Sequence, residues 1–133
     1  MGMISRIAYC LIFAMLAGSC SPSFPEPSAQ DPSPILGCYV APDAPWFVID
    51  ASTVKFAGDG KGVSYRYELP KVGTVLRVPM DAAIVDGRLI FTPSEDRFYR
   101  VLHTSAGPVV RVAFGKEGLL RDYQHKSLDE CTG

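Results

Sequence analysis

The stretch VSYRYEL, at residues 63–69, has the clearest alternation of apolar and polar residues in the chain. Successive side chains of a strand point to opposite faces, so this period of two predicts a strand with one buried face. The buried set would be Val63, Tyr65, Tyr67 and Leu69, and the set facing solvent would be Ser64, Arg66 and Glu68. The stretch therefore favours a sheet with a core on one side only.

The next signal along the chain is Asp86-Gly87, which lies between the apolar runs 83–85 and 88–92. Asp-Gly between two such runs is a strong hairpin signal, because both residues tolerate positive φ. Residues 58–62, Gly-Asp-Gly-Lys-Gly, and residues 105–108, Ser-Ala-Gly-Pro, predict further turns. These turns make the neighbouring strands antiparallel.

Short strands of this kind recur through the whole of residues 35–133. We expect strands at 36–40, 46–50, 53–57, 63–69, 74–79, 83–85, 88–92, 97–102, 109–114 and 118–123. The predicted fold class is all-β, a small antiparallel β-barrel or sandwich of about eight strands. Residues 117–130 fit a short helix about as well as a closing strand.

The start of this domain, Gly37-Cys38-Tyr39, resembles the Gly-x-Trp opening of lipocalin-like barrels, with Tyr39 in place of the Trp. In that family the aromatic residue plugs the base of the barrel. The resemblance covers three residues and implies architecture only.

The first 19 residues have the three parts of a secretory signal peptide. Arg6 is the only charged side chain before Glu26, and the twelve residues from Ile7 to Gly18 carry no charge. At 1.5 Å per residue these twelve reach roughly 18 Å as a helix, short of the roughly 30 Å of a bilayer core. We therefore expect residues 1–19 to be cleaved rather than retained as a membrane span.

The segment Leu16-Ala17-Gly18-Ser19-Cys20 resembles the lipobox of bacterial lipoproteins, with Leu16 one position earlier than the family's usual Leu. In that family a diacylglycerol is attached to the Cys sulfur, the chain is cut just before it, and the new N-terminus is usually acylated as well. The resemblance implies palmitate-type lipidation at Cys20 and attachment to the membrane of the bacterial cell envelope. Ser21 is not the Asp associated with inner-membrane retention, which favours the outer membrane in a Gram-negative source. An ordinary secreted protein is the alternative.

Residues 20–34 follow as a linker. The fourteen residues from Ser21 to Pro34 include five Pro and four Ser and show no apolar period. Proline fixes φ and removes hydrogen-bond donors, so we expect a disordered, extended tether. The β domain is then residues 35–133.

Cys38 and Cys131 bracket this domain almost end to end. Export to an oxidising compartment favours a disulfide between them. A closed antiparallel barrel would also place its first and last strands side by side. Two free thiols, or two metal ligands, are the alternatives.

Catalytic and cofactor signatures are absent from the sequence. The chain has 133 residues and a net charge of −1, which provides no basic surface for nucleic acid. His103 and His125 stand in no metal-ligand spacing, and no GxSxG elbow is present. We expect no metal, and no cofactor other than the lipid on Cys20. The 13 Lys and Arg side chains are nearly matched by 14 Asp and Glu, which predicts a mixed, solvated surface.

The sequence favours a membrane-anchored envelope lipoprotein whose small, non-enzymatic β domain binds a protein or another envelope component. A lipocalin-like carrier or sensor of a small apolar ligand is one alternative. An enzyme or enzyme inhibitor with a site hidden from sequence is another, and His103 is the residue that such a site would recruit.

Overall fold

The computed structural model describes residues 28–58, 61–70 and 73–132. The predicted signal peptide, Cys20 and the tether up to residue 27 lie outside the described residues. Within the described part, no helix is long and apolar enough to cross a bilayer.

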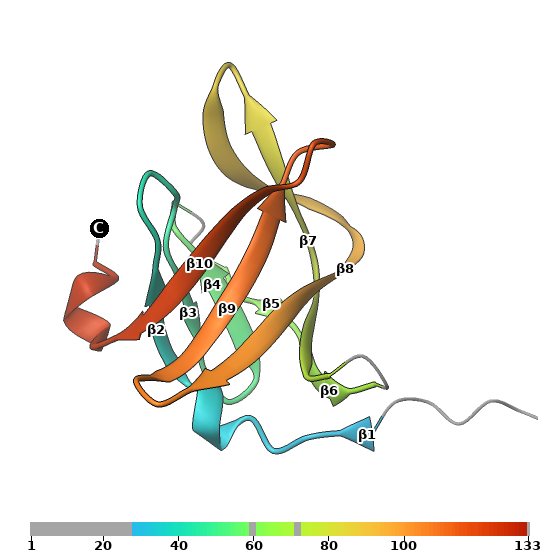
Figure 1. Ribbon diagram of the computed structural model, residues 1–133, viewed down its shortest axis with the longest axis vertical. Coiled ribbons are helices and arrows are strands. Elements are labelled where there is room, and N and C mark those ends of the chain that lie inside the picture. Colours follow the sequence, from blue (N-terminus) through green and yellow to red (C-terminus); the bar gives the residue numbers. More distant parts are fainter. Residues whose placement is uncertain (1–27, 59–60, 71–72, 133) are drawn as a thin grey trace, which may run out of the picture.

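The described chain is all-β, as expected, and its strands form one antiparallel sheet that closes into a nearly complete barrel (Figure 1). The strands are β1 (Ser28–Ala29), β2 (Gly37–Val40), β3 (Phe47–Ile49), β4 (Thr53–Phe56), β5 (Val63–Ser64), β6 (Arg66–Leu69), β7 (Val75–Val85), β8 (Arg88–Thr104), β9 (Gly107–Phe114) and β10 (Leu119–Lys126). There are also two single 3-10 turns: η1 (Ser33–Ile35) lies between β1 and β2, and η2 (Leu128–Glu130) follows β10.

The strands follow one another around the barrel in chain order, in the sequence β6-β7-β8-β9-β10-β2-β3-β4-β5. The last strand closes on the first, because β10 pairs with β2 in the register Gln124↔Val40. Strands β5 and β6 are two halves of one stretch that is interrupted at Tyr65: β5 pairs with β4 and β6 pairs with β7. If this stretch is counted once, the barrel is an eight-stranded meander.

The strand predictions need two corrections. The expected strands 74–79 and 83–85 are one strand, β7, and 88–92 and 97–102 are one strand, β8. Their register shifts between Val78 and Met80, and Pro93 lies opposite Met80 at that irregularity. A bulge tolerates a residue without an N–H, so proline does not end the strand there. The doubtful segment 117–130 is the closing strand β10 followed by η2.

The tether prediction is wrong for residues 28–34. Strand β1 adds to the edge of β6, with Ser28 opposite Leu69, and the Gln30 N–H donates to the Tyr67 carbonyl at 2.7 Å. The turn η1 then covers one end of the barrel, where Ile35 is fully buried. The unpaired edge of β6 offers backbone partners that a proline-rich chain can still use at its non-proline positions. Order therefore begins before residue 35.

The interior of the barrel is packed with aromatic rings. Phe91 lies among five of them, at centroid distances of 4.5–6.2 Å. Its neighbours are Phe47, Phe56, Tyr99, Phe114 and Tyr123. All five are buried, so these side chains fill the middle of the barrel with ring–ring contacts.

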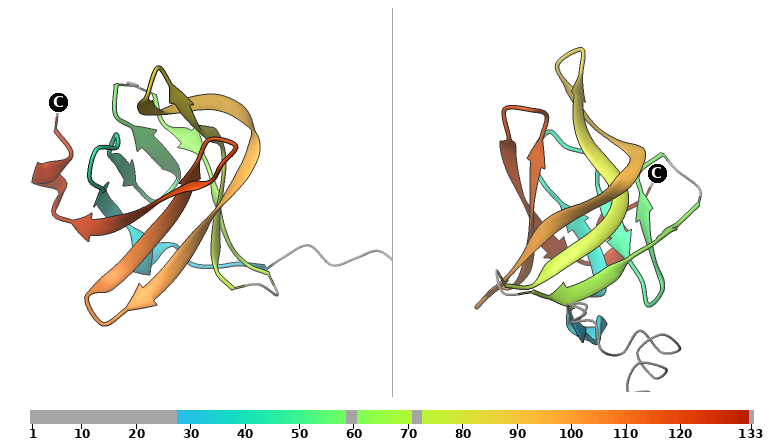
Figure 2. Two further views of the ribbon diagram at one scale, coloured as in Figure 1. Left: turned by 45° about the horizontal axis from the view of Figure 1, so that its top comes forward. Right: turned by 90° about the vertical axis from the view of Figure 1, so that its right-hand side faces the viewer.

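The β7–β8 hairpin projects past the end of the barrel opposite η1 (Figures 1 and 2). Its tip is the predicted Asp86-Gly87 turn, and both residues have positive φ, 52° and 75°. Lower down, the Gly115 N–H donates to the Ala82 carbonyl at 3.0 Å, which fixes the hairpin to the β9–β10 turn.

Candidate functional site

A disulfide joins Cys38 of β2 to Cys131, just after η2, across 93 residues of sequence. The two Cα atoms lie 5.8 Å apart, which is typical of a disulfide. The predicted pairing is thus present in the structure. It holds η2 against the outer wall of the barrel, because Cys38 and the buried Tyr39 beside it point to opposite faces of β2.

One row of side chains crosses this outer wall. Lys126 of β10 pairs with Cys38 of β2, Cys38 with Val48 of β3, and Val48 with Lys55 of β4. Residues directly opposite one another in a sheet share a face. The row spans three strand spacings, about 14 Å, and has a lysine at each end.

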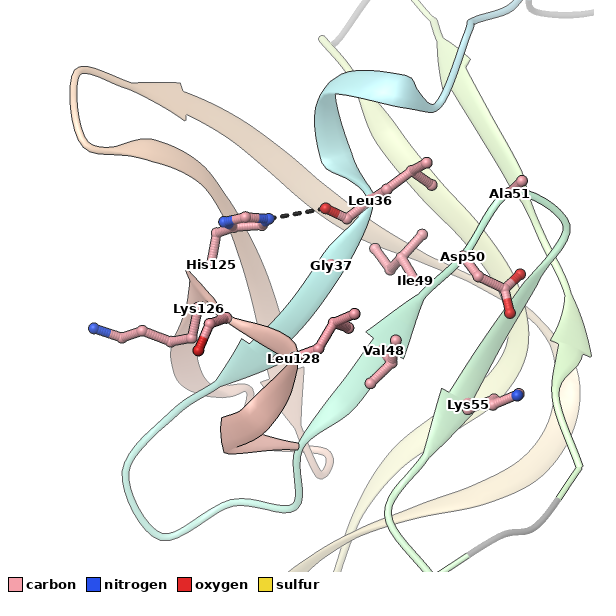
Figure 3. A pocket seen from close by; sticks show the side chains of 11 residues that line it. Leu36, Gly37, Val48, Ile49, Asp50, Ala51, Lys55, His125, Lys126 and Leu128 are labelled. Carbon is pink, nitrogen blue, oxygen red and sulfur yellow. Dashed lines mark hydrogen bonds between the residues drawn. The ribbon is translucent and has the colours of Figure 1, made fainter. Parts of the chain in front are cut away.

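A groove of about 560 Å³ lies along this row, between η2 and strands β2 to β4 (Figure 3). Its lining residues are Leu36, Gly37, Val48, Ile49, Asp50, Ala51, Lys55, His125, Lys126, Ser127 and Leu128. Leu128 of η2 faces Val48 across it, and 62% of Leu128 is exposed. A large leucine left this exposed next to other apolar side chains can bind an apolar group.

The end of the groove next to η1 is built from an interlocked set of residues. The His125 ring lies over Gly37 and donates from Nε2 to the Leu36 carbonyl at 2.8 Å. Its edge packs on Tyr39, with the ring centroids 5.4 Å apart. The Tyr39 hydroxyl in turn donates to the Ile35 carbonyl at 2.6 Å. His125 lies directly opposite Tyr39 in the pairing of β10 with β2, so both rings hold the backbone at this end from the same face of the sheet.

The charged side chains around the groove differ in whether they already have partners within the protein. The Asp50 carboxylate accepts the N–H groups of Ser52 and Thr53, at 3.0 and 2.7 Å, and these bonds lower its pKa below the usual value. Within the described part of the chain, Lys55 and Lys126 make no ion pair. Figure 3 shows their side chains on opposite flanks of the groove. Lys126 is thus available to a ligand, whereas the charge of Lys55 also acts on Asp50 and helps to lower its pKa.

His103, the residue that a hidden active site would recruit, lies at the end of β8. Its Nε2 is 3.0 Å from the Tyr67 hydroxyl and 3.4 Å from the Thr74 Oγ1. Thr74 Oγ1 also donates to the Val101 carbonyl at 2.9 Å. These contacts connect β6 and β8 with Thr74, the residue just before β7, at the rim of the barrel.

The arginine side chains on the strand faces are mostly paired with acids, as the balanced composition predicts. Arg111 Nε lies 2.7 Å from an Asp122 oxygen, and Arg77 Nε lies 2.9 Å from an Asp96 oxygen. The contact with Arg111 lowers the pKa of Asp122. Among the described residues, no three His, Cys, Asp or Glu side chains gather as a metal site would require.

The alternation in residues 63–69 places Glu68 on the face exposed to solvent, and this prediction is wrong. Its side chain is fully buried, between Arg66 Nε at 3.1 Å and Arg77 at 3.6 Å, whereas Leu69 is half exposed. Strand β1 pairs Ala29 directly opposite Glu68, and Leu69 lies at the end of β6. The alternation within residues 63–69 cannot predict an ion cluster that is formed with Arg77 of the paired strand β7.

The residues of the groove were also missed from the sequence. Val48 is one residue of an ordinary apolar strand, and Leu128 is an isolated apolar residue in a charged tail. The row of Lys126, Cys38, Val48 and Lys55 appears only once β10 pairs with β2.

Comparisons with protein-family models, curated proteins and solved structures found no match for this chain.

Proposed function

We propose that this protein is a lipid-anchored component of the bacterial cell envelope whose β domain acts by binding, not by catalysis. The observation that carries the proposal is the distribution of apolar surface. Aromatic rings pack the middle of the barrel, while an apolar groove on the outer wall is held open to solvent beside a disulfide. A packed interior and a hollowed exterior favour a docking domain over a carrier with its ligand inside the barrel.

The anchor enters the proposal through Cys20 and the short distance to the first described strand. Eight residue steps separate Cys20 from Ser28, a reach of at most roughly 28 Å. Since β1 is paired with β6, the domain would be held near the membrane with the η1 end of the barrel closest to it. The groove begins at Leu36, directly after η1, and would lie on this side of the domain.

The anchor is tested by replacing its acceptor, Cys20→Ala, in the full chain. We expect an uncut precursor that carries no lipid, measured by membrane fractionation and intact mass. Cys10→Ala is the matched control and should be processed normally. Normal cleavage and membrane retention of Cys20→Ala would contradict the lipoprotein proposal.

The docking surface is tested with a photoreactive amino acid placed at position 128 or, in a control, at position 120. Both leucines are more than half exposed, but Leu120 lies on β10 outside the groove. In living cells we expect cross-links to an envelope component, protein or lipid, from position 128 and not from position 120. Equal labelling from both positions, or none from 128, would contradict a binding role for the groove.

A further inference from the structure

We propose that the occupant of the groove is a single-chain anionic amphiphile, one acyl chain with a carboxylate head. This inference rests on the proposed function and names the ligand class of the same site. It follows from the order of side chains in the row across the wall, where Val48 lies between two lysines.

The apolar part of the site matches one hydrocarbon chain. Its floor and walls are Leu36, Val48, Ala51 and Leu128, and its volume of about 560 Å³ falls within the roughly 300–1,000 Å³ of small-molecule sites. The groove is open along one side rather than enclosed, which suits a flexible chain that enters from a membrane surface. A second acyl chain would find no comparable apolar wall, because charged Lys55 and Lys126 flank the row.

The charged part of the site matches an anionic head. Lys55 and Lys126 form no ion pair among the described residues, and their flexible stems allow either ammonium to meet a head group at its end of the groove. The one lining carboxylate, Asp50, is kept ionised by the N–H groups of Ser52 and Thr53 and lies at the Lys55 end, so its charge favours an anionic head group at the Lys126 end. An ammonium near the end of an apolar groove favours a carboxylate over a neutral alcohol of equal length.

Access to the membrane supports the same occupant. Leu36 follows η1 directly, and η1 follows the tether strand β1. The groove therefore begins at the end of the domain that the anchor holds nearest the lipid. A partner protein would not need this placement, whereas an amphiphile that leaves the bilayer would.

The test uses the full chain in phosphatidylcholine vesicles, with a photoreactive saturated fatty acid as the probe and the matching fatty alcohol as its neutral counterpart. We expect the fatty acid to label peptides that contain Val48 and Leu128. Leu128→Asp should lower this labelling about tenfold, the change that corresponds to losing one buried leucine contact. Leu120→Asp is the control and should label as the unaltered protein does.

The head group is tested by Lys55→Gln combined with Lys126→Gln. Labelling by the acid should fall up to about fivefold, as for an exposed ion pair, and labelling by the alcohol should not change. Lys116→Gln, in the β9–β10 turn, is the charge control. Equal loss for acid and alcohol, or labelling of Leu128→Asp at the normal level, would overturn the inference.

The cross-linking in cells separates this inference from the proposed function. Cross-links from position 128 to protein alone would overturn the amphiphile and leave the binding role intact. Cross-links to lipid from position 128 would support both.

Discussion

At the scale of single residues, Gly37 and His125 depend on each other. Gly37 has a φ of 141°, and a Cβ built on it would lie 2.4 Å from the His125 Nε2. The imidazole occupies the place of a side chain, where it bonds the Leu36 carbonyl and packs on Tyr39. A glycine is needed here for close approach as well as for its backbone conformation.

Gly37→Ala should therefore destabilise the fold by about 1–3 kcal/mol, since it displaces the imidazole and strains the backbone. The free energy of unfolding is measured by denaturant titration. In a His125→Ala background the same change should cost only about 1 kcal/mol, because the steric part is gone. Additive costs in this double-mutant cycle would contradict the proposed contact.

The buried tyrosines predict how the protein responds to alkali. Burial raises the pKa of the Tyr39, Tyr99 and Tyr123 hydroxyls well above the usual value. A folded-state pKa above the unfolded value means that the stabilisation is complete below pH ~10 and is lost as pH rises further. We expect phenolate absorbance of these residues to appear together with loss of the circular dichroism of the sheet. Ionisation of all the tyrosines in a still-folded protein would contradict this.

At the scale of elements, strand β8 carries two phenylalanines with opposite roles. Phe91 lies among the five interior rings, whereas 61% of Phe98 is exposed and its ring lies under the Arg77 guanidinium, 5.9 Å away. The same residue type on one strand thus provides a matched pair for measuring what the filled interior contributes.

Phe91→Ala should cost about 2–3 kcal/mol in unfolding free energy, because the partly buried ring leaves a gap among five other rings. Phe98→Ala should cost less than about 1 kcal/mol, as is usual for a surface position. Thermal and denaturant unfolding of both variants would measure the difference. Equal costs would show that the interior is not the packed cluster described above.

The elements also show what local sequence can and cannot predict. Asp86-Gly87 determines its own turn through backbone conformation, so the hairpin was predictable from two residues. The fusion of 88–92 and 97–102 into β8 was not, because Pro93 ends a strand except beside a bulge, and the bulge depends on β7. The burial of Glu68 and the position of the groove were not predictable for the same reason, since both depend on residues that are brought together across strands.

At the scale of the whole molecule, closure of the barrel places residues from both ends of the chain side by side. The pairing of β10 with β2 was predictable mainly from the cysteines, because a disulfide between Cys38 and Cys131 would place the first and last strands of the domain side by side. The addition of β1 to β6 was not, because a proline-rich stretch shows no strand pattern and is ordered here only by a free edge of the barrel.

Replacing both Cys38 and Cys131 with Ser should lower the unfolding free energy by about 2–5 kcal/mol, given the long loop that the disulfide closes. Denaturant unfolding with and without a reducing agent measures this. Reductant should lower the unfolding midpoint of the unaltered protein and leave that of the double variant unchanged. A midpoint of the unaltered protein that ignores the reductant would contradict the bond.

The disulfide also affects how the domain would respond to a mechanical load. The N-terminal segment first meets the barrel at β1, which pairs with β6, and then enters β2, where Cys38 is bonded to Cys131, three residues beyond Leu128 in the groove wall. A pull between the membrane and a bound ligand would thus first load the short pairing of β1 with β6. The disulfide then passes the load from β2 directly to η2, so β1 would detach from β6 before η2 leaves the wall of the barrel.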